Sequence, residues 1–466
     1  MKYVCGVLLC AVAANAQPTL VGNWLGTLDA GAAKLTLAFH VTQNERGEMT
    51  ATLDSLDQNL KGAPVKEVAM QGDRVRFDIA GLRAVYEAQI TADGSALSGT
   101  FTQLRALPLR MRKVDKVEAQ ARPQEPKAPF PYRSEDVFYQ SRGSAVAGTL
   151  TIPSGEGRFP AVILISGSGP QDRDGTFASH KPFLVIADSL TRRGIAVLRV
   201  DDRGAGKSAG EPSALTIEQI SDDVLQALEF LKNDPRLDAR RIGVIGHGEG
   251  AIVGSLAAVR SKDVSFVVML AGVGVPGDEA LAMQAETLAR AAGVREDAIA
   301  QNRAVQSVVF KVLRADSDPR TAVYKLTNEY QAMRTGLSAA QRTALDLAGI
   351  EATLERRFAA VSAPEIRSIV LSNSAEILRR VTVPTLALHG AQDSQLSAAQ
   401  NLPGIATALA VGGNTNFSVA TLPGLNHMFQ TCGTCLPNEY GELEETFSPT
   451  ALAIMGDWIV RQSLPR

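Results

Sequence analysis

The chain has 466 residues, 45% hydrophobic and 21% charged, which is enough for two or three cores rather than one. A formal net charge of −2 gives no electrostatic reason to expect nucleic acid or an anionic membrane surface as a partner. What remains is a multidomain globular protein with small-molecule or protein partners.

The first residues have the pattern of a signal peptide. Lys2 is followed by an apolar run over residues 4–12, too short to span a bilayer, and then by the small-x-small sequence Ala14-Asn15-Ala16. We therefore expect residues 1–16 to be removed and the mature protein to be periplasmic or extracellular. A lipoprotein site at Cys10 is a weaker alternative, because a bulky residue precedes it. No later stretch is apolar and long enough to predict a membrane span.

Residues 17–114 alternate apolar and polar side chains with a period of two, which predicts β strands. Turn sequences such as Ala92-Asp93-Gly94-Ser95 separate the runs. We expect a small antiparallel, barrel-like β domain here. Trp24, near its start, fits either an ordinary core residue or a plug at one end of a barrel.

Four prolines among charged residues mark 115–132 as a linker. Beyond it, over 133–466, continuous apolar runs alternate with segments of helical periodicity. Such runs predict a mostly parallel sheet with helices on both faces. The main runs are 161–165, 196–200, 242–245, 266–270 and 385–388. An insertion at about 275–380 is helical in pattern throughout and is expected to form a cap over the sheet.

A sharp turn is predicted where one of these strands ends. Gly246-His247-Gly248-Glu249-Gly250 lies directly between a strand and a helix, as in a nucleophile elbow. The central position of that motif normally holds the nucleophilic serine, but here it is Gly248.

Two further motifs follow later strands. Asp393 comes directly after the strand at 385–388, placed to orient a histidine, and His427 follows a short strand at 418–422. The order of nucleophile position, acid and histidine is that of α/β-hydrolases. The backbone N–H groups of Ser168, in a Gly-rich loop after the first strand, and of Glu249 are candidate oxyanion-hole donors.

These motifs resemble those of bacterial exported α/β-hydrolases called dienelactone-hydrolase-like or prolyl-oligopeptidase-like serine esterases. The resemblance covers roughly residues 133–462 and rests on 167–174, 202–208, 246–250, 388–393, 426–430 and 444–449. It implies an α/β-hydrolase fold with a helical cap after a small antiparallel β domain, carboxylic-ester hydrolysis, Asp393 as acid and His427 as base. A small-molecule ester is the implied substrate, and no cofactor or metal is implied.

Gly248 departs from that pattern. Without a hydroxyl at this position no acyl-enzyme can form, although the fold should tolerate glycine well. Three explanations are open: an engineered inactive variant, a natural ligand-binding pseudoenzyme, or an enzyme in which His427 and Asp393 activate a water molecule. The sequence predicts an impaired esterase first and a noncatalytic binding protein second.

Once the signal is removed, Cys432 and Cys435 are the remaining cysteines. In an oxidising compartment this Cys-Gly-Thr-Cys pair predicts a small structural disulfide rather than a metal or redox centre. His247 and His389 are each expected to be a packed, hydrogen-bonded histidine rather than a catalyst. The sequence predicts neither the identity of the ester nor the oligomeric state.

Overall fold

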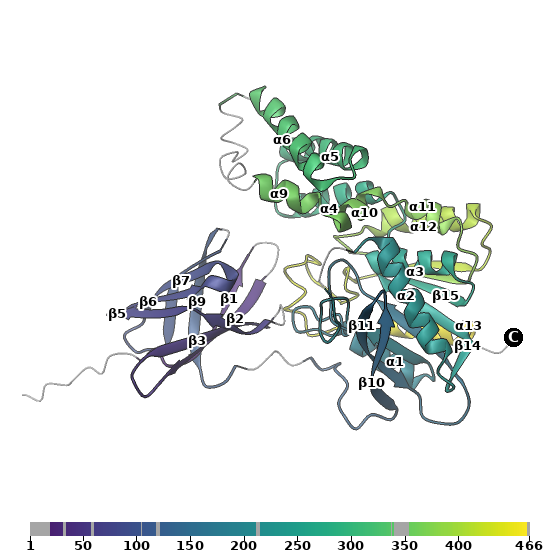
Figure 1. Ribbon diagram of the computed structural model, residues 1–466, viewed down its shortest axis with the longest axis horizontal. Helices are drawn as coiled ribbons and strands as arrows, with labels where there is room; N and C mark the ends of the chain where they lie inside the picture. Colours follow the sequence, from purple (N-terminus) through teal and green to yellow (C-terminus); the bar gives the residue numbers. More distant parts are fainter. Residues whose placement is uncertain are drawn as a thin grey trace, which may run out of the picture. The chain divides into compact units, whose positions relative to one another are not determined.

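The computed structural model describes residues 19–30, 34–56, 60–103, 105–117, 122–210, 215–336, 338–339 and 354–463. The chain divides into two compact units, Met1–Gln120 and Ala121–Arg466 (Figure 1). The predicted signal peptide lies outside the described residues. Of the helices that are described, none combines the length and apolar character needed to cross a bilayer.

The first unit is an antiparallel sheet of nine strands in the order β4-β3-β2-β1-β9-β8-β7-β6-β5. Its strands are β1 Gly22–Asp29, β2 Lys34–Gln43, β3 Met49–Ser55, β4 Leu60–Val65, β5 Glu67–Gln71, β6 Arg74–Ile79, β7 Ala84–Ile90, β8 Ala96–Thr102 and β9 Ala106–Val114. β3 also contacts β5 and β4 contacts β6, so the sheet curls back on itself.

The alternating side chains of these strands form one core, because successive residues of a strand point to opposite faces. Phe39 and Phe77 stack with ring centres 4.4 Å apart, and Tyr86 lies parallel to both. Trp24 is fully buried in the same core and donates its indole N–H to the carbonyl of Leu20.

The second unit contains an eight-stranded sheet in the order β10-β11-β13-β12-β14-β15-β16-β17. Its strands are β10 Arg133–Ser141, β11 Ser144–Ile152, β12 Phe159–Ile165, β13 Ala196–Val200, β14 Leu237–His247, β15 Val264–Leu270, β16 Thr385–Gly390 and β17 Phe417–Leu422. The strands from β13 to β17 in this order pair in parallel, whereas β10 and β11 pair antiparallel.

Helices cover both faces of this sheet. Ile163 of β12 belongs to an apolar cluster shared with α2, α3 and α12, whereas its neighbours Val162 and Leu164 belong to a second cluster shared with α1 and α13. The helices are α1 Pro182–Arg192, α2 Ile217–Lys232, α3 Glu249–Arg260, α12 Ala398–Val411 and α13 Pro449–Gln462. Strands buried on both faces explain the continuous apolar runs in the sequence.

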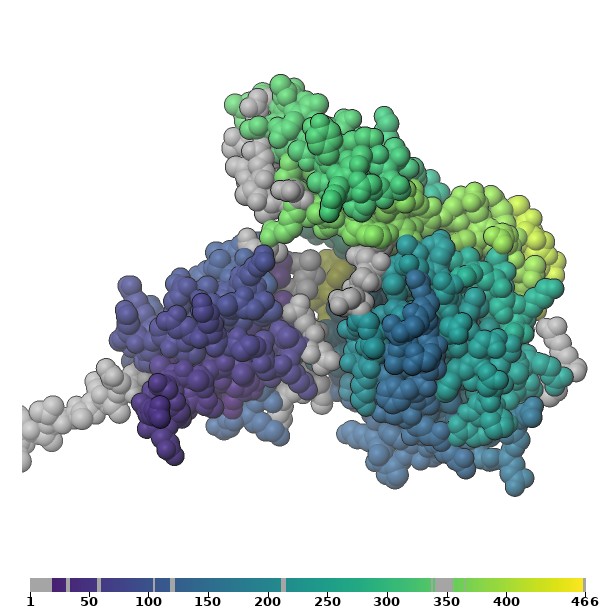
Figure 2. Space-filling view, in the orientation of Figure 1, coloured from purple at the N-terminus to yellow at the C-terminus, as the bar shows by residue number. Residues whose placement is uncertain are grey.

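Between β15 and β16 the described chain is helical, and in Figure 2 these residues form a green lobe above the teal sheet region. The helices are α4 Gly277–Ala291, α5 Glu296–Ala315, α6 Pro319–Thr335, α9 Leu354–Val361, α10 Pro364–Leu371 and α11 Ser374–Leu378. A β-bridge between Pro276 and Asn373 joins the two ends of this cap. The predicted fold class, α/β with a helical cap after an antiparallel β unit, is confirmed.

Part of the segment predicted as a linker, 115–132, packs against the second unit. The guanidinium of Arg122 is buried and donates to three backbone carbonyls, those of Ala178, Gly441 and Leu443. Gln124 exchanges hydrogen bonds with the backbone of Phe447. The end of this segment therefore belongs to the second unit.

Candidate active site

The turn between β14 and α3 has the backbone of a nucleophile elbow. Gly248 has φ +56° and ψ −116°, a conformation that side-chain-bearing residues rarely adopt. Its neighbours are glycines for steric reasons: a Cβ on Gly246 would lie 2.1 Å from the carbonyl oxygen of Gly250, and one on Gly250 would lie 2.3 Å from that of Ser166. The motif therefore brings α3 into close contact with the loop after β12, which contains Ser166 and Ser168 and is called the oxyanion loop below.

Asp393 and His427 meet at the carboxyl ends of β16 and β17. The Nδ1–H of His427 donates to Oδ2 of Asp393 at 2.8 Å, and Oδ1 accepts from the backbone N–H groups of Gln395 and Leu396, each also at 2.8 Å. Burial raises the pKa of Asp393, but the charge and hydrogen bond of His427 and the N–H of Leu396 lower it more, so that this pKa lies below its usual range. The carboxylate thus stays ionised and fixes the tautomer of the ring.

The other nitrogen of His427 points at the elbow. An ideal Cβ on Gly248 would lie 3.8 Å from Nε2 of His427, with no closer atom outside the adjoining residues. A serine hydroxyl at this position would therefore come within hydrogen-bonding reach of the base. The three predicted site positions Gly248, Asp393 and His427 are brought together.

The predicted oxyanion donors lie in the loop after β12 and at the first residue of α3. Ser168 belongs to the loop after β12, which is fixed to Asp202 by the Oγ–H of Ser166 at 2.7 Å and the backbone N–H of Gln171 at 2.9 Å. Ser168 and Glu249 line one cavity of about 150 Å³. That their two N–H groups point to one oxygen stays a prediction.

His247 is packed and hydrogen-bonded, as the sequence predicts, but the sequence did not indicate its partner. Its Nε2–H donates to the backbone carbonyl of His427 at 3.0 Å, and the two rings lie 4.7 Å apart. Burial lowers the pKa of His247 to about 4, so the ring is neutral. His247 therefore holds the backbone of the base. Its position inside the Gly-His-x-Glu-Gly motif was the only sequence signal for this contact.

The remaining buried histidines differ from each other. His180 donates from Nε2 to the carbonyl of Tyr440 and accepts at Nδ1 from the hydroxyl of Thr446. His389 is fully buried, as predicted, but the prediction that it is hydrogen-bonded is wrong: neither of its ring nitrogens has a hydrogen-bond partner among the described residues. Burial lowers the pKa of each of these two histidines to about 4.

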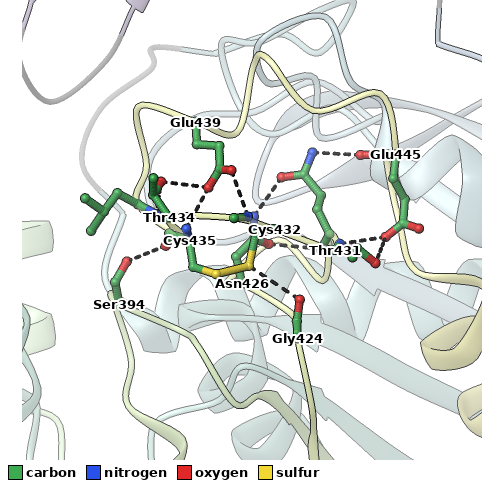
Figure 3. Close-up of a disulfide and its surroundings, with 12 residues drawn as sticks. Ser394, Gly424, Asn426, Thr431, Cys432, Thr434, Cys435, Glu439 and Glu445 are labelled. Carbon is green, nitrogen blue, oxygen red and sulfur yellow. Dashed lines mark hydrogen bonds between the residues drawn. A yellow bond between two sulfur atoms is a disulfide. The ribbon is translucent and has the colours of Figure 1, made fainter.

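The Cys432–Cys435 pair forms a disulfide beside the two catalytic loops (Figure 3). The hydroxyl of Ser394, next to Asp393, donates to the carbonyl of Cys435 at 3.0 Å, and the N–H of Cys432 donates to the carbonyl of Gly424 at 3.2 Å. The disulfide loop thus contacts both the loop that carries Asp393 (the acid loop) and the loop that carries His427 (the histidine loop). No cluster of potential metal ligands occurs among the residues that the structure describes.

Comparisons with known proteins identify the family of this chain. A sequence family described as "Serine aminopeptidase, S33" matches residues 175–431, more than half of the chain. The chain is 30% identical over 302 residues to "Esterase EstD" of Thermotoga maritima, which covers 64% of this chain and 61% of that esterase. An uncharacterized 31.7 kDa protein of Escherichia coli is 27% identical over 120 residues, 25% of this chain and 38% of that protein. The chain thus spans less than two thirds of these relatives' lengths.

Solved structures with a similar fold have lower sequence identity. The Pyrococcus furiosus esterase PF2001 matches with a TM-score of 0.43 and 14% identity, over 72% of this chain and 92% of that one. The α/β hydrolase GrgF from Penicillium sp. sh18 matches with a TM-score of 0.44 and 16% identity, over 71% and 99%.

Proposed function

The chain belongs to the serine aminopeptidase S33 family of α/β-hydrolases, and from this membership we propose that it is a carboxylic-ester hydrolase impaired by Gly248. The relative named as an esterase supports the ester as substrate class. The observation that carries the proposal is the 3.8 Å separation between Nε2 of His427 and the Cβ that a side chain at position 248 would have. The base is aimed at the place where the nucleophile is missing.

The acid, the base and the oxyanion donors that remain could still activate a water molecule for ester hydrolysis. Asp393 keeps the proton of His427 on Nδ1, which leaves Nε2 free to take a proton from a water molecule beside Gly248. The N–H groups of Ser168 and Glu249 would stabilise the oxyanion, and losing one such donor typically costs about 10²–10³ in rate. Sites of this kind without their serine retain about 10³–10⁴ over the uncatalysed rate.

The alternative is a noncatalytic protein that binds a small-molecule ligand with the same cavity. Gly248 itself favours this alternative, because the substitution removes covalent catalysis and leaves the cavity next to Ser168 and Glu249 intact. A natural pseudoenzyme and an engineered inactive variant have the same chemistry.

Hydrolysis of p-nitrophenyl butyrate by the native protein and by Gly248→Ser distinguishes these possibilities, with Gly248→Ala as matched control. We expect the serine variant to gain at least about 10³ in kcat/KM, since covalent catalysis is restored, and the alanine variant to gain nothing. His427→Ala should abolish the gain. A serine variant no faster than the alanine variant would contradict the esterase proposal and leave the binding protein.

The same assay tests the water mechanism. If His427 activates water, the slow hydrolysis by the native protein should fall on His427→Ala. An unchanged rate would exclude His427 as the base of the native protein.

We further propose that the protein is exported. The pattern of residues 1–16 supports this, and so does the Cys432–Cys435 disulfide, since disulfides persist in oxidising compartments. Fractionation of expressing cells, with the mass of the mature chain, tests it: the product should begin near Gln17. Unprocessed chain in the cytoplasm would contradict the proposal.

A further inference from the structure

The base of the proposed reaction lies in a tight loop between Leu425 and Thr431, which are joined by a β-bridge. Inside this loop the backbone N–H of Asn426 donates to the carbonyl of Gln430, and the carbonyl of Asn426 accepts from the N–H of Phe429, each at 3.1 Å. Phe429 has a φ of +60°, in the left-handed region that bulky side chains disfavour. A loop with such a residue keeps one conformation only where its surroundings fix it.

Two buried amide side chains fix this loop. Asn426 is fully buried and Gln430 is 1% exposed. Oδ1 of Asn426 accepts from the backbone N–H of Gln430 at 2.9 Å, and Nδ2–H of Asn426 donates to Oε1 of Gln430 at 3.0 Å. Together with the backbone bond, these contacts join the two ends of the short segment that carries His427.

The carbonyl groups around Gln430 determine which way both amides face. Nε2 of Gln430 donates to the backbone carbonyls of Tyr440 and Glu445, at 3.3 and 2.9 Å. Its Oε1 therefore faces Asn426, which has to present Nδ2–H to it and Oδ1 to the backbone. A carboxylate at either position would bring an oxygen against another acceptor, because a carboxylate has no N–H to donate. The pair thus requires amides and not only side chains of this volume.

The segment that holds Gln430 is itself held by Arg122. The guanidinium of Arg122 is buried and donates to the carbonyls of Gly441 and Leu443. These lie between the two carbonyls that Gln430 uses, so both side chains hold the segment 440–445. Since Arg122 precedes β10, it connects the part of the chain before the sheet to the loop of the base.

We propose that Asn426 and Gln430 are positioning residues of the hydrolase, which hold the backbone of His427 so that its Nε2 points to position 248, and that Arg122 acts on the base through them. The inference rests on the proposed function, because a base has a role only if a reaction takes place. Its physical part, a loop held in one conformation by two amides, does not depend on that function.

Kinetics of p-nitrophenyl butyrate hydrolysis in the Gly248→Ser background test the positioning. Gln430→Met and Asn426→Leu roughly keep the volume of the side chain and remove its hydrogen bonds. We expect each to lower kcat at least about tenfold, because a small displacement of the base slows proton transfer.

The Michaelis constant separates positioning from substrate binding. Within the described part of the chain, neither amide has a hydrogen bond to the elbow or to the oxyanion loop. We therefore expect KM to change less than about threefold in Gln430→Met and Asn426→Leu. An unchanged kcat in either variant, or a KM that rises as much as kcat falls, would overturn the inference.

Asn414→Leu is the matched control. The side chain of Asn414 is also a buried amide, and its Nδ2 donates to the carbonyls of Val381 and Val383 at 3.1 and 2.9 Å. It precedes β17, so it lies at the amino ends of the parallel strands, whereas the acid and the base meet at their carboxyl ends. We expect Asn414→Leu to lower the urea midpoint as Asn426→Leu does but to keep kcat. An equal loss of kcat in the two variants would overturn the inference.

Asn426→Asp decides the matter if Asn426→Leu or Gln430→Met does not fold. The aspartate keeps the shape of the side chain and the acceptor for the N–H of Gln430, and replaces only the donor to Oε1. We expect it to lower kcat at least about tenfold with little change in KM. Full kcat in Asn426→Asp would overturn the inference.

A double-mutant cycle tests the role of Arg122. Arg122→Lys keeps the charge but replaces the planar fork, which donates to separate carbonyls, by a single ammonium group. In the Gly248→Ser background we expect it to lower kcat about threefold, and to have almost no further effect once Gln430→Met is present, since both changes act through the segment 440–445. No effect of Arg122→Lys, or effects that multiply, would overturn the role of Arg122.

The native full chain allows a test without catalysis. The proton that Nδ1 of His427 shares with Asp393 should give a downfield ¹H NMR resonance, identified by its loss in His427→Gln. We expect Gln430→Met and Asn426→Leu, each introduced alone, to broaden or shift this resonance, and Asn414→Leu to leave it unchanged. A native protein without the resonance, or a resonance that neither amide variant affects, would overturn the inference.

The two readouts distinguish this inference from the proposed function. An active Gly248→Ser variant whose kcat does not respond to Gln430→Met or Asn426→Leu would refute the positioning and leave the proposed function standing. An inactive Gly248→Ser variant, together with a native resonance that responds as expected, would refute the proposed function and leave the amide pair as the support of His427.

Discussion

At the scale of single residues, Gly248 combines a backbone conformation that would strain any other residue with a missing side chain. Its φ of +56° and ψ of −116° lie in a region that costs a residue with a Cβ about 1–3 kcal/mol. We therefore expect Gly248→Ala to lower the free energy of unfolding by about 1–3 kcal/mol. The free energy of unfolding of Gly248→Ser should lie between those of the native protein and Gly248→Ala, since the serine hydroxyl can donate to Nε2 of His427. Urea unfolding of the three proteins measures these free energies. An alanine variant as stable as the native protein would contradict the claim that a Cβ at position 248 strains the backbone.

Some of these residues can be predicted from their position after a strand. Asp393 and His427 each follow a strand, in an order that few folds share, so the sequence alone brings them together. The role of His247 depends on the group that faces it after folding, the carbonyl of His427. No local pattern encodes such contacts between distant segments.

At the scale of elements, the loop closed by Cys432 and Cys435 connects the acid loop to the histidine loop. The disulfide closes a loop of four residues, and its removal should lower the free energy of unfolding by about 2 kcal/mol, because the unfolded chain gains entropy. In the Gly248→Ser background we expect the double variant Cys432→Ser/Cys435→Ser to lose stability by about this amount and to hydrolyse esters several-fold more slowly. The reason for the slower reaction is that Ser394 and Gly424 lose a fixed neighbour.

The rate of ester hydrolysis, measured with and without dithiothreitol, shows the effect of reducing the disulfide. The double variant is the control, because it has no disulfide and dithiothreitol should not slow it. The carboxylate of Glu439 accepts from the backbone N–H groups of Gly433 and Cys435, so part of the loop should keep its conformation. An unaltered rate in the double variant would show that the disulfide does not support the catalytic loops.

The buried strands were predictable because both of their faces are covered. The run 161–165 lies within β12, and 196–200 coincides with β13. β10 and β11 were not individually predicted: β10 is the edge strand, half exposed along its length, so its sequence lacks a continuous apolar run. The extent predicted for the helical insertion, about 275–380, agrees with cap helices that run from Gly277 to Leu378. The boundaries of the individual helices were not predicted, since α4 and α5 begin without a side-chain cap.

At the scale of the whole molecule, the second unit depends on several ionisable groups that are buried in their neutral form. His180, His247 and His389 each have a pKa lowered from 6.5 to about 4, in each case mainly by burial. In the unfolded chain these histidines take up protons below about pH 6.5. The unfolded state therefore binds more protons between pH 6.5 and 4, and the stability that neutral burial permits is lost as the pH falls through this window.

Asp202 opposes this trend. Its pKa is raised to about 6, so between pH 6 and 4 the folded state takes up a proton that the unfolded state does not. The proton that Asp202 takes up in the folded state thus offsets about one of the three protons that the histidines take up in the unfolded state. The net effect is still a loss of stability in acid.

His389 offers the sharpest test of this balance, because its nitrogens have no hydrogen-bond partner within the described residues. Replacing it by leucine removes no hydrogen bond, so at pH 7.5 the free energy of unfolding should change by less than about 1.5 kcal/mol. At pH 4.5 the native protein must hold this imidazole neutral against its tendency to protonate, at a cost of at most about 3 kcal/mol, and His389→Leu escapes that cost. Urea unfolding at the two pH values should therefore show a smaller acid loss for His389→Leu than for the native protein. His180→Leu, which breaks the bonds to Thr446 and Tyr440, should be destabilised already at pH 7.5. An equal acid loss in His389→Leu and the native protein would mean that His389 is not held neutral by its burial.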